Sequence, residues 1–161
     1  MRIPLLILAL TAPLCAQYPI DANALRWEGT TSSAGPFCWG FSCEPARAEV
    51  VPGESGTLIV RGEWNQVYAL GISLGSDRCL ELPGISHALV LDDPILIVRI
   101  GICDDPSPIL ACPNGLDHIG VTIPGFMPPG FSFSVQAIVG VPGWPVVRGW
   151  ALTQGIRFVV R

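Results

Sequence analysis

The chain has 161 residues, of which 50% are apolar and only 14% are charged, and its formal net charge is −4. A chain this apolar is far from the composition of a disordered protein. Arginine supplies all nine basic residues and lysine is absent, so the sequence lacks the basic surface that binds nucleic acid or anionic membranes. We expect neither as a partner, and no cofactor.

The first sixteen residues predict a secretory signal peptide. Met1 and Arg2 give a positive start, residues 3–14 are almost wholly apolar, and Ala16 is a small residue at which cleavage can occur. This stretch is too short to span a membrane, and no later stretch has eighteen uninterrupted apolar residues. We therefore expect residues 17–161 to form one secreted domain in an extracellular, cell-surface or periplasmic space.

Alternation of apolar and polar residues predicts strands along the whole mature chain, with Gly and Pro between them. No window of a dozen residues has a helical stripe bounded by caps. The predicted strands are residues 25–28, 46–51, 56–62, 66–74, 86–91, 94–102, 117–123, 131–139 and 150–160. This pattern predicts an all-β fold, a single antiparallel β-sandwich of about seven to nine strands with disulfide-stapled loops.

Two of the later strands carry detailed expectations. Residues 94–102 are apolar on both faces, which favours a central strand. Residues 131–139 alternate between a core face and a face with Ser134 and Gln136, which we expect to be solvated.

The last predicted strand, residues 150–160, should be the antiparallel neighbour of residues 131–139. Its core face begins with Trp150, and Gln154 beside Gly155 indicates a bulge.

The mature chain has five cysteines, so at least one cannot pair within the chain. Proximity in sequence predicts the pairs Cys38–Cys43 and Cys103–Cys112 and leaves Cys79 unpaired. Sequence alone leaves other pairings open, including ones that use Cys79. No Cys-x-x-Cys spacing is present, so we expect no zinc site.

One segment matches the serine nucleophile elbow G-x-S-x-G, namely Gly71, Ser73 and Gly75. An aspartate at 104 or 105 and then His118 follow in the order that hydrolases of that kind use. The elbow requires a sharp strand-to-helix turn, whereas this motif lies within a strand pattern. We expect Ser73 to be a small polar residue on a strand and the protein not to be an enzyme.

Acidic residues occur at several predicted turns: Asp92, Asp93, Asp104, Asp105 and Asp117. Calcium favours such carboxylates, but their spacing matches no calcium loop. Asp-Asp-Pro occurs twice and is typical of turns, so we expect turn formation and no bound metal.

Three tryptophans fall in predicted loops, Trp39, Trp64 and Trp144. An exposed indole can stack on a sugar or on a protein surface. The simpler interpretation is that these rings plug the ends of the sandwich.

The closing strands carry a resemblance. The segments Val135-Gln136-Ala137-Ile138-Val139 and Ala151-Leu152-Thr153-Gln154-Gly155-Ile156 resemble the last two strands of a large set of secreted bacterial modules of unknown function. The resemblance implies a secreted β-sandwich and no activity, ligand or catalytic residue.

These observations predict a secreted, non-enzymatic structural or interaction module whose partner is an extracellular protein or a glycan. A carbohydrate-binding module that uses the loop tryptophans is the alternative, and a serine hydrolase through Ser73 is the second alternative.

Overall fold

The computed structural model describes residues 22–107, 112–141 and 149–161, and the predicted signal peptide lies outside these ranges. The described residues form 13 strands and no helix, so the predicted all-β fold is confirmed. The expected strand number was too low. Five of the strands have only two or three residues, which is too short to show an alternation of apolar and polar residues. The eight longer strands all fall on predicted segments.

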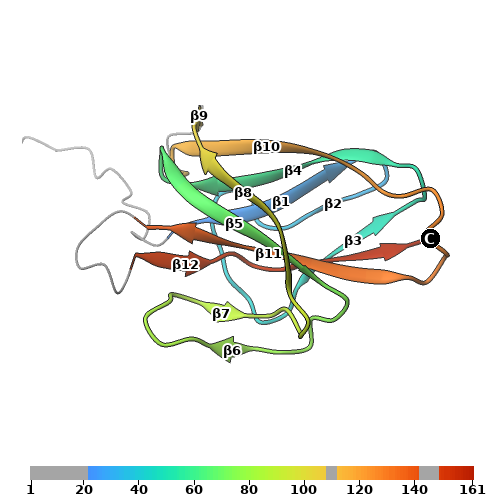
Figure 1. Ribbon diagram of the computed structural model, residues 1–161. Coiled ribbons are helices and arrows are strands. Elements are labelled where there is room, and N and C mark those ends of the chain that lie inside the picture. Colours follow the sequence, from blue (N-terminus) through green and yellow to red (C-terminus); the bar gives the residue numbers. More distant parts are fainter. Residues whose placement is uncertain (1–21, 108–111, 142–148) are drawn as a thin grey trace, which may run out of the picture.

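The strands form two layers with a small hairpin outside them (Figure 1). Sheet A has the order β2 (Ser33–Ala34), β1 (Ala24–Gly29), β4 (Ser55–Gly62), β10 (Gly115–Thr122) and β9 (Asp105–Pro106). Sheet B has the order β3 (Ala46–Val50), β13 (Ile156–Val160), β11 (Ser132–Gly140), β5 (Gln66–Ser73) and β8 (Leu96–Cys103), and β12 (Trp150–Leu152) also pairs with β11. The hairpin consists of β6 (Leu80–Glu81) and β7 (Ala88–Leu89). Pairing is antiparallel throughout both sheets except between β3 and β13.

The core lies between the two sheets, where alternate residues of each strand meet. Trp27 of β1 is fully buried and meets the ring of Phe158 edge-on, with 5.2 Å between ring centroids. Phe158 in turn stacks on Phe133 of β11 at 4.9 Å. Aromatic pairs of this kind add about 0.5–1.5 kcal/mol each beyond their buried area, so these rings tie the two sheets together.

The bulge predicted near Gly155 is present, because β12 and β13 pair with two successive parts of β11 and are separated by residues 153–155. Trp150 does not lie on the core face, which corrects the expectation. The bulge exchanges the faces, so Ile156 points into the core while Trp150 is 39% exposed.

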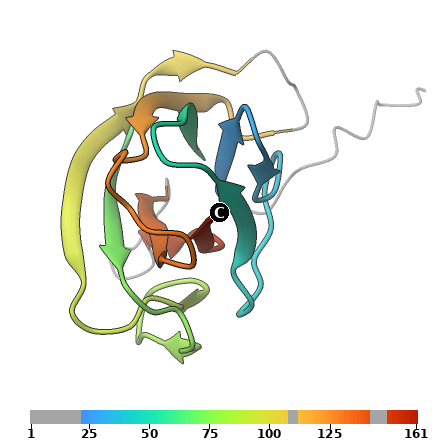
Figure 2. The same ribbon diagram turned by 90° about the vertical axis from the view of Figure 1, so that its right-hand side faces the viewer.

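The strand predicted to be central is an edge strand. β8 pairs only with β5 among the described strands, and Figure 2 shows it as the outermost strand of its sheet. Apolar residues on both faces of a strand are typical of a strand inside a sheet. Which strands pair with it at its two edges depends on the sheet order, which its own sequence does not encode.

The predicted disulfide pairs are wrong. Cys38 is bonded to Cys112 and Cys43 to Cys79, while Cys103 is a free, buried thiol. Both bonds join segments that are distant in sequence, with separations of 74 and 36 residues. Proximity along the chain therefore selected the wrong partners, and folding brought the right ones together.

Candidate functional site

The outer face of sheet B has two unlike halves, because the described residues cover one half of it and leave the other bare. We expected its polar residues to be solvated, but Ser134 and Gln136 are 1% and 2% exposed. The segment that contains β6 and β7 covers them. The alternation of β11 does not encode this tertiary contact, so it wrongly predicted a solvated face.

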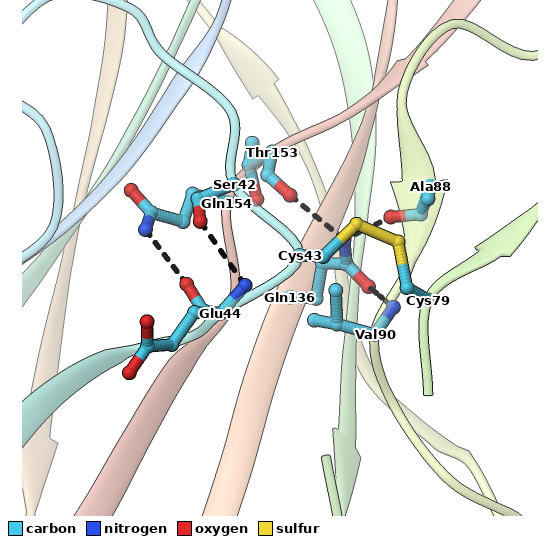
Figure 3. Close-up of a disulfide and its surroundings, with 9 residues drawn as sticks. All are labelled: Ser42, Cys43, Glu44, Cys79, Ala88, Val90, Gln136, Thr153 and Gln154. Carbon is cyan, nitrogen blue, oxygen red and sulfur yellow. Dashed lines mark hydrogen bonds between the residues drawn. A yellow bond between two sulfur atoms is a disulfide. The ribbon is translucent and has the colours of Figure 1, made fainter. Parts of the chain in front are cut away.

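Gln136 holds this covering segment in place with its side-chain amide (Figure 3). Its Oε1 accepts a hydrogen bond of 3.0 Å from the N–H of Val90, and its Nε2 donates to the carbonyl oxygens of Ala88, at 2.9 Å, and Thr153, at 2.7 Å. Every polar atom of the amide is thus paired in a site without water access, where an unpaired group would be costly. One glutamine therefore joins β11, β7 and the bulge.

The Cys43–Cys79 bond attaches the same segment covalently (Figure 3). It connects the loop before β3 to the residue before β6. Gln154, which lies between β12 and β13, donates to the carbonyl of Glu44 in that loop at 2.9 Å. The covering segment is consequently fixed by a covalent bond and a buried amide, in addition to the backbone hydrogen bonds between Ser86 and β12.

A pocket of about 180 Å³ lies where the covering segment ends. Leu82 and Leu89 of the covering segment form one wall, and Ile95 and Ile97 form the wall toward β8. Ala69 and Ile138 belong to its floor, which continues into the bare half of the face.

The bare half is apolar across four strands. One row runs from Leu152 through Ile138 and Ala69 to Ile100, as the strand registers require. In the next row Trp150 is opposite Gly140, Gly140 lies against Val67, and Val67 is opposite Ile102.

The exposed members of this half are Val67, Ile97, Ile100, Ile102 and Trp150, which we call the β8 surface. Their exposed fractions run from 39% for Trp150 to 76% for Ile100. Grouped large apolar side chains with this exposure mark interaction sites in soluble proteins.

The inner side of β8 carries a compact polar cluster that ties it to sheet A. Arg99 donates from Nε to the Tyr68 hydroxyl at 2.8 Å and from Nη2 to Asp117 Oδ2 at 2.9 Å, and the Tyr68 hydroxyl donates to the same carboxylate oxygen. Burial raises the pKa of Tyr68, and the hydrogen bond to Asp117 raises it further. The phenol is therefore a proton donor at all physiological pH values, and the single charged residue of β8 is used internally.

The structure places two of the predicted tryptophans near one short segment. Trp39 follows Cys38, which is bonded to Cys112. The backbone N–H of Trp64 donates to Asn114 Oδ1 at 2.9 Å, and its indole N–H donates to the carbonyl of Asp104 at 3.1 Å. Both rings are about half exposed, at 49% and 57%. Trp144 lies outside the described residues.

The remaining candidates do not assemble a reaction centre. Ser73 is buried, its hydroxyl donates to the carbonyl of Gly75, and the chain continues as a loop without the helix that a nucleophile elbow needs. His118 is on β10 of sheet A, 3.4 Å from Asp105, whereas Ser73 is on sheet B.

The acidic turns form ion pairs of their own. Arg78 binds Asp92 at 3.2 Å and Asp93 at 2.7 Å. In the described part of the chain no three His, Cys, Asp or Glu side chains are grouped so that they could hold a metal. The same residues include no helix with the length and apolarity that a membrane crossing demands.

Comparisons with protein-family models, with curated proteins and with solved structures find no match to this chain. The β8 surface is the feature that sequence reasoning missed, because residues 94–102 were expected in a central strand and Trp150 on the core face. The apolar character of both faces of residues 94–102 was the available signal.

Proposed function

We propose that this protein is a secreted, non-enzymatic structural module that associates with a second copy of itself through the β8 surface. The observation that carries the proposal is an eight-residue edge strand with apolar, exposed side chains. Two disulfides and the signal-like first residues support an oxidising, extracellular setting.

β8 carries few of the devices by which proteins prevent pairing at a sheet edge. Such devices include edge lysines, prolines, inward-pointing charges and β-bulges, and β8 has one inward-pointing charge, Arg99, and one register irregularity opposite Leu70 and Gly71. The chain contains no lysine, residues 96–103 contain no proline, and the only charge in this range, Arg99, is bound to Tyr68 and Asp117. An edge left in this state is a template for a further strand.

A second copy fits this edge better than an unrelated partner because antiparallel pairing of one strand with itself is two-fold symmetric. The same apolar patch then meets itself, as an isologous interface requires. With the two-fold axis at Ile100, Ile100 of each copy would lie beside its counterpart, and Ile97 and Ile102 would flank this pair and extend the bare face across the new sheet.

The interface expected from this pairing is small. An eight-residue strand is about 26 Å long, and pairing it while covering the β8 surface buries on the order of 1,000 Å². Weak, reversible complexes have interfaces of this size, so we expect dissociation in the micromolar range.

Sedimentation velocity of the purified protein between about 1 and 300 μM tests the proposal, a range that brackets micromolar dissociation. We expect a concentration-dependent dimer that becomes stronger with added salt. Antiparallel pairing brings Asp104 and Asp105 of one copy near Asp92 and Asp93 of the other, and salt screens their repulsion.

The variant Ile100→Lys places a charge on the pairing edge and should leave the protein monomeric. Phe126→Lys is the matched control, because Phe126 is 86% exposed but lies in the loop between β10 and β11. A monomeric wild-type protein, or a dimer that survives Ile100→Lys, rejects the proposal.

Glycan binding is the second candidate function, and the exposed rings of Trp39 and Trp64 beside residues 112–114 favour it. Stacked indoles supply sugar affinity without charge. A glycan array should then give a signal that is lost in Trp39→Ala and Trp64→Ala and kept in Phe126→Ala. No signal on a broad array removes this candidate.

A further inference from the structure

A second apolar space lies inside the sandwich, independent of the surface of β8. It has a volume of about 230 Å³ and all its lining residues are apolar. Leu58 and Val121 come from sheet A, and Leu70, Ile72 and Val98 come from the last two strands of sheet B. Val135 and the stacked rings of Phe133 and Phe158 complete it.

The cavity lies beyond the contacts that join β8 to sheet A, which are the Arg99 cluster and, at the far end of the strand, the buried Cys103 beside the carbonyl of Val60. In that cluster Arg99, Tyr68 and Asp117 join β8, β5 and β10. Farther along the seam the facing residues are Val98 and Val121, which are too short to fill the space between the sheets. Val98 is 55% exposed while Leu58 and Phe158 are each 2% exposed, so the cavity opens at Val98 and is closed at its rear.

The chemistry of the lining decides what can enter. A buried water needs two to four polar partners, and apolar cavities of about 150 Å³ remain dry and bind benzene. The cavity here is larger and offers no hydrogen-bonding side chain. A polar ligand would lose its hydration without compensation.

We propose that this cavity is a binding site for a small, uncharged, apolar molecule of about six to ten carbon atoms. The ligand enters between β8 and β10 beside Val98 and contacts the faces of the two phenylalanine rings. The site stands on the cavity alone and does not depend on self-association.

Toluene is a suitable probe, and its binding can be followed by methyl NMR of the intact protein. We expect saturable shifts of the methyl groups of Leu58, Leu70 and Val121, with a dissociation constant on the order of 0.1–1 mM. Phenol has the same ring but a hydroxyl group that finds no partner, so it should bind at least about tenfold more weakly.

The variant Val121→Phe fills the cavity and should abolish these shifts without lowering the unfolding temperature. Ile72→Phe fills it from β5 and replaces Val121→Phe if that variant does not fold. Val51→Phe, at an exposed position directly after β3 and outside the cavity lining, is the matched control and should bind toluene as the wild-type protein does.

The titration is repeated in the monomeric Ile100→Lys background, so that its outcome is separate from that of the dimer. An absence of saturable shifts up to the solubility limit of toluene overturns the proposal. Shifts confined to Leu82 and Leu89, which line the other pocket, overturn it equally.

Discussion

The two halves of the outer face of sheet B are built from the same strands and have opposite surroundings. In one half a polar residue, Gln136, is 2% exposed under the segment that carries β6 and β7. In the other half an apolar residue, Ile100, is 76% exposed. Residue type therefore does not decide burial on this face. The exposure of a residue on this face depends instead on whether the covering segment lies over it.

Removing the Cys43–Cys79 disulfide should give the largest loss of unfolding free energy, and the loss should concern the covered half. In Cys43→Ser with Cys79→Ser, a closure of 36 residues is lost, and the chain-entropy relation gives a cost of about 4 kcal/mol. Urea unfolding measures the change, and limited proteolysis should show new cleavage in residues 76–92. An unchanged cleavage pattern would mean that the amide of Gln136 and the hydrogen bonds of Ser86 to β12 hold the segment without the disulfide.

The variant Gln136→Leu leaves three buried backbone groups without their side-chain partner. At about 1 kcal/mol for each lost bond we expect a loss of about 3 kcal/mol in unfolding free energy. Gln154→Leu is the matched control, since Gln154 makes a single exposed bond to the carbonyl of Glu44, and it should cost under about 0.5 kcal/mol. Equal effects of the two substitutions would contradict the assigned role of Gln136.

The attachment of β8 can be tested with Arg99→Met, which removes the cation between Tyr68 and Asp117. Because Asp117 is only 15% exposed and loses its counter-charge, we expect a loss of about 1–2 kcal/mol. Amide hydrogen exchange should become faster in β8 and remain unchanged in β13. Arg47→Met removes a more exposed pair with Glu49 and should have no measurable effect.

The bare half should tolerate polar substitution. Ile100→Thr and Ile102→Thr should change the unfolding free energy by less than about 0.5 kcal/mol, measured on the monomer, because their side chains face solvent. A loss above about 2 kcal/mol in either variant would show that these residues are packed in the monomer and would remove the distinction between the two halves.

The alternation of β4, β5, β10 and β11 was sufficient to predict the strands and the sandwich, because period-two patterning encodes which residues share a face. It could not predict what covers that face. Gln136 is partnered by Val90, 46 residues away, and nothing near either residue indicates the contact.

The same non-local limit applies to the site. Residues 94–102 have the composition of a central strand, and only the sheet order puts them at an edge. Cys38 and Cys43 are five residues apart but have partners in two different segments. Of the predicted site residues, Trp39 and Trp64 were correctly expected to lie in loops, because they stand among turn-forming residues.

The free thiol at the end of β8 gives the molecule an internal reporter. Cys103 is completely buried, and burial raises its pKa to about 12. A thiol reagent can therefore modify it only after this end of β8 separates from the core, and the modification rate at constant pH measures how often that separation occurs. Opening of this edge can thus be measured on the native sequence, without introducing a cysteine.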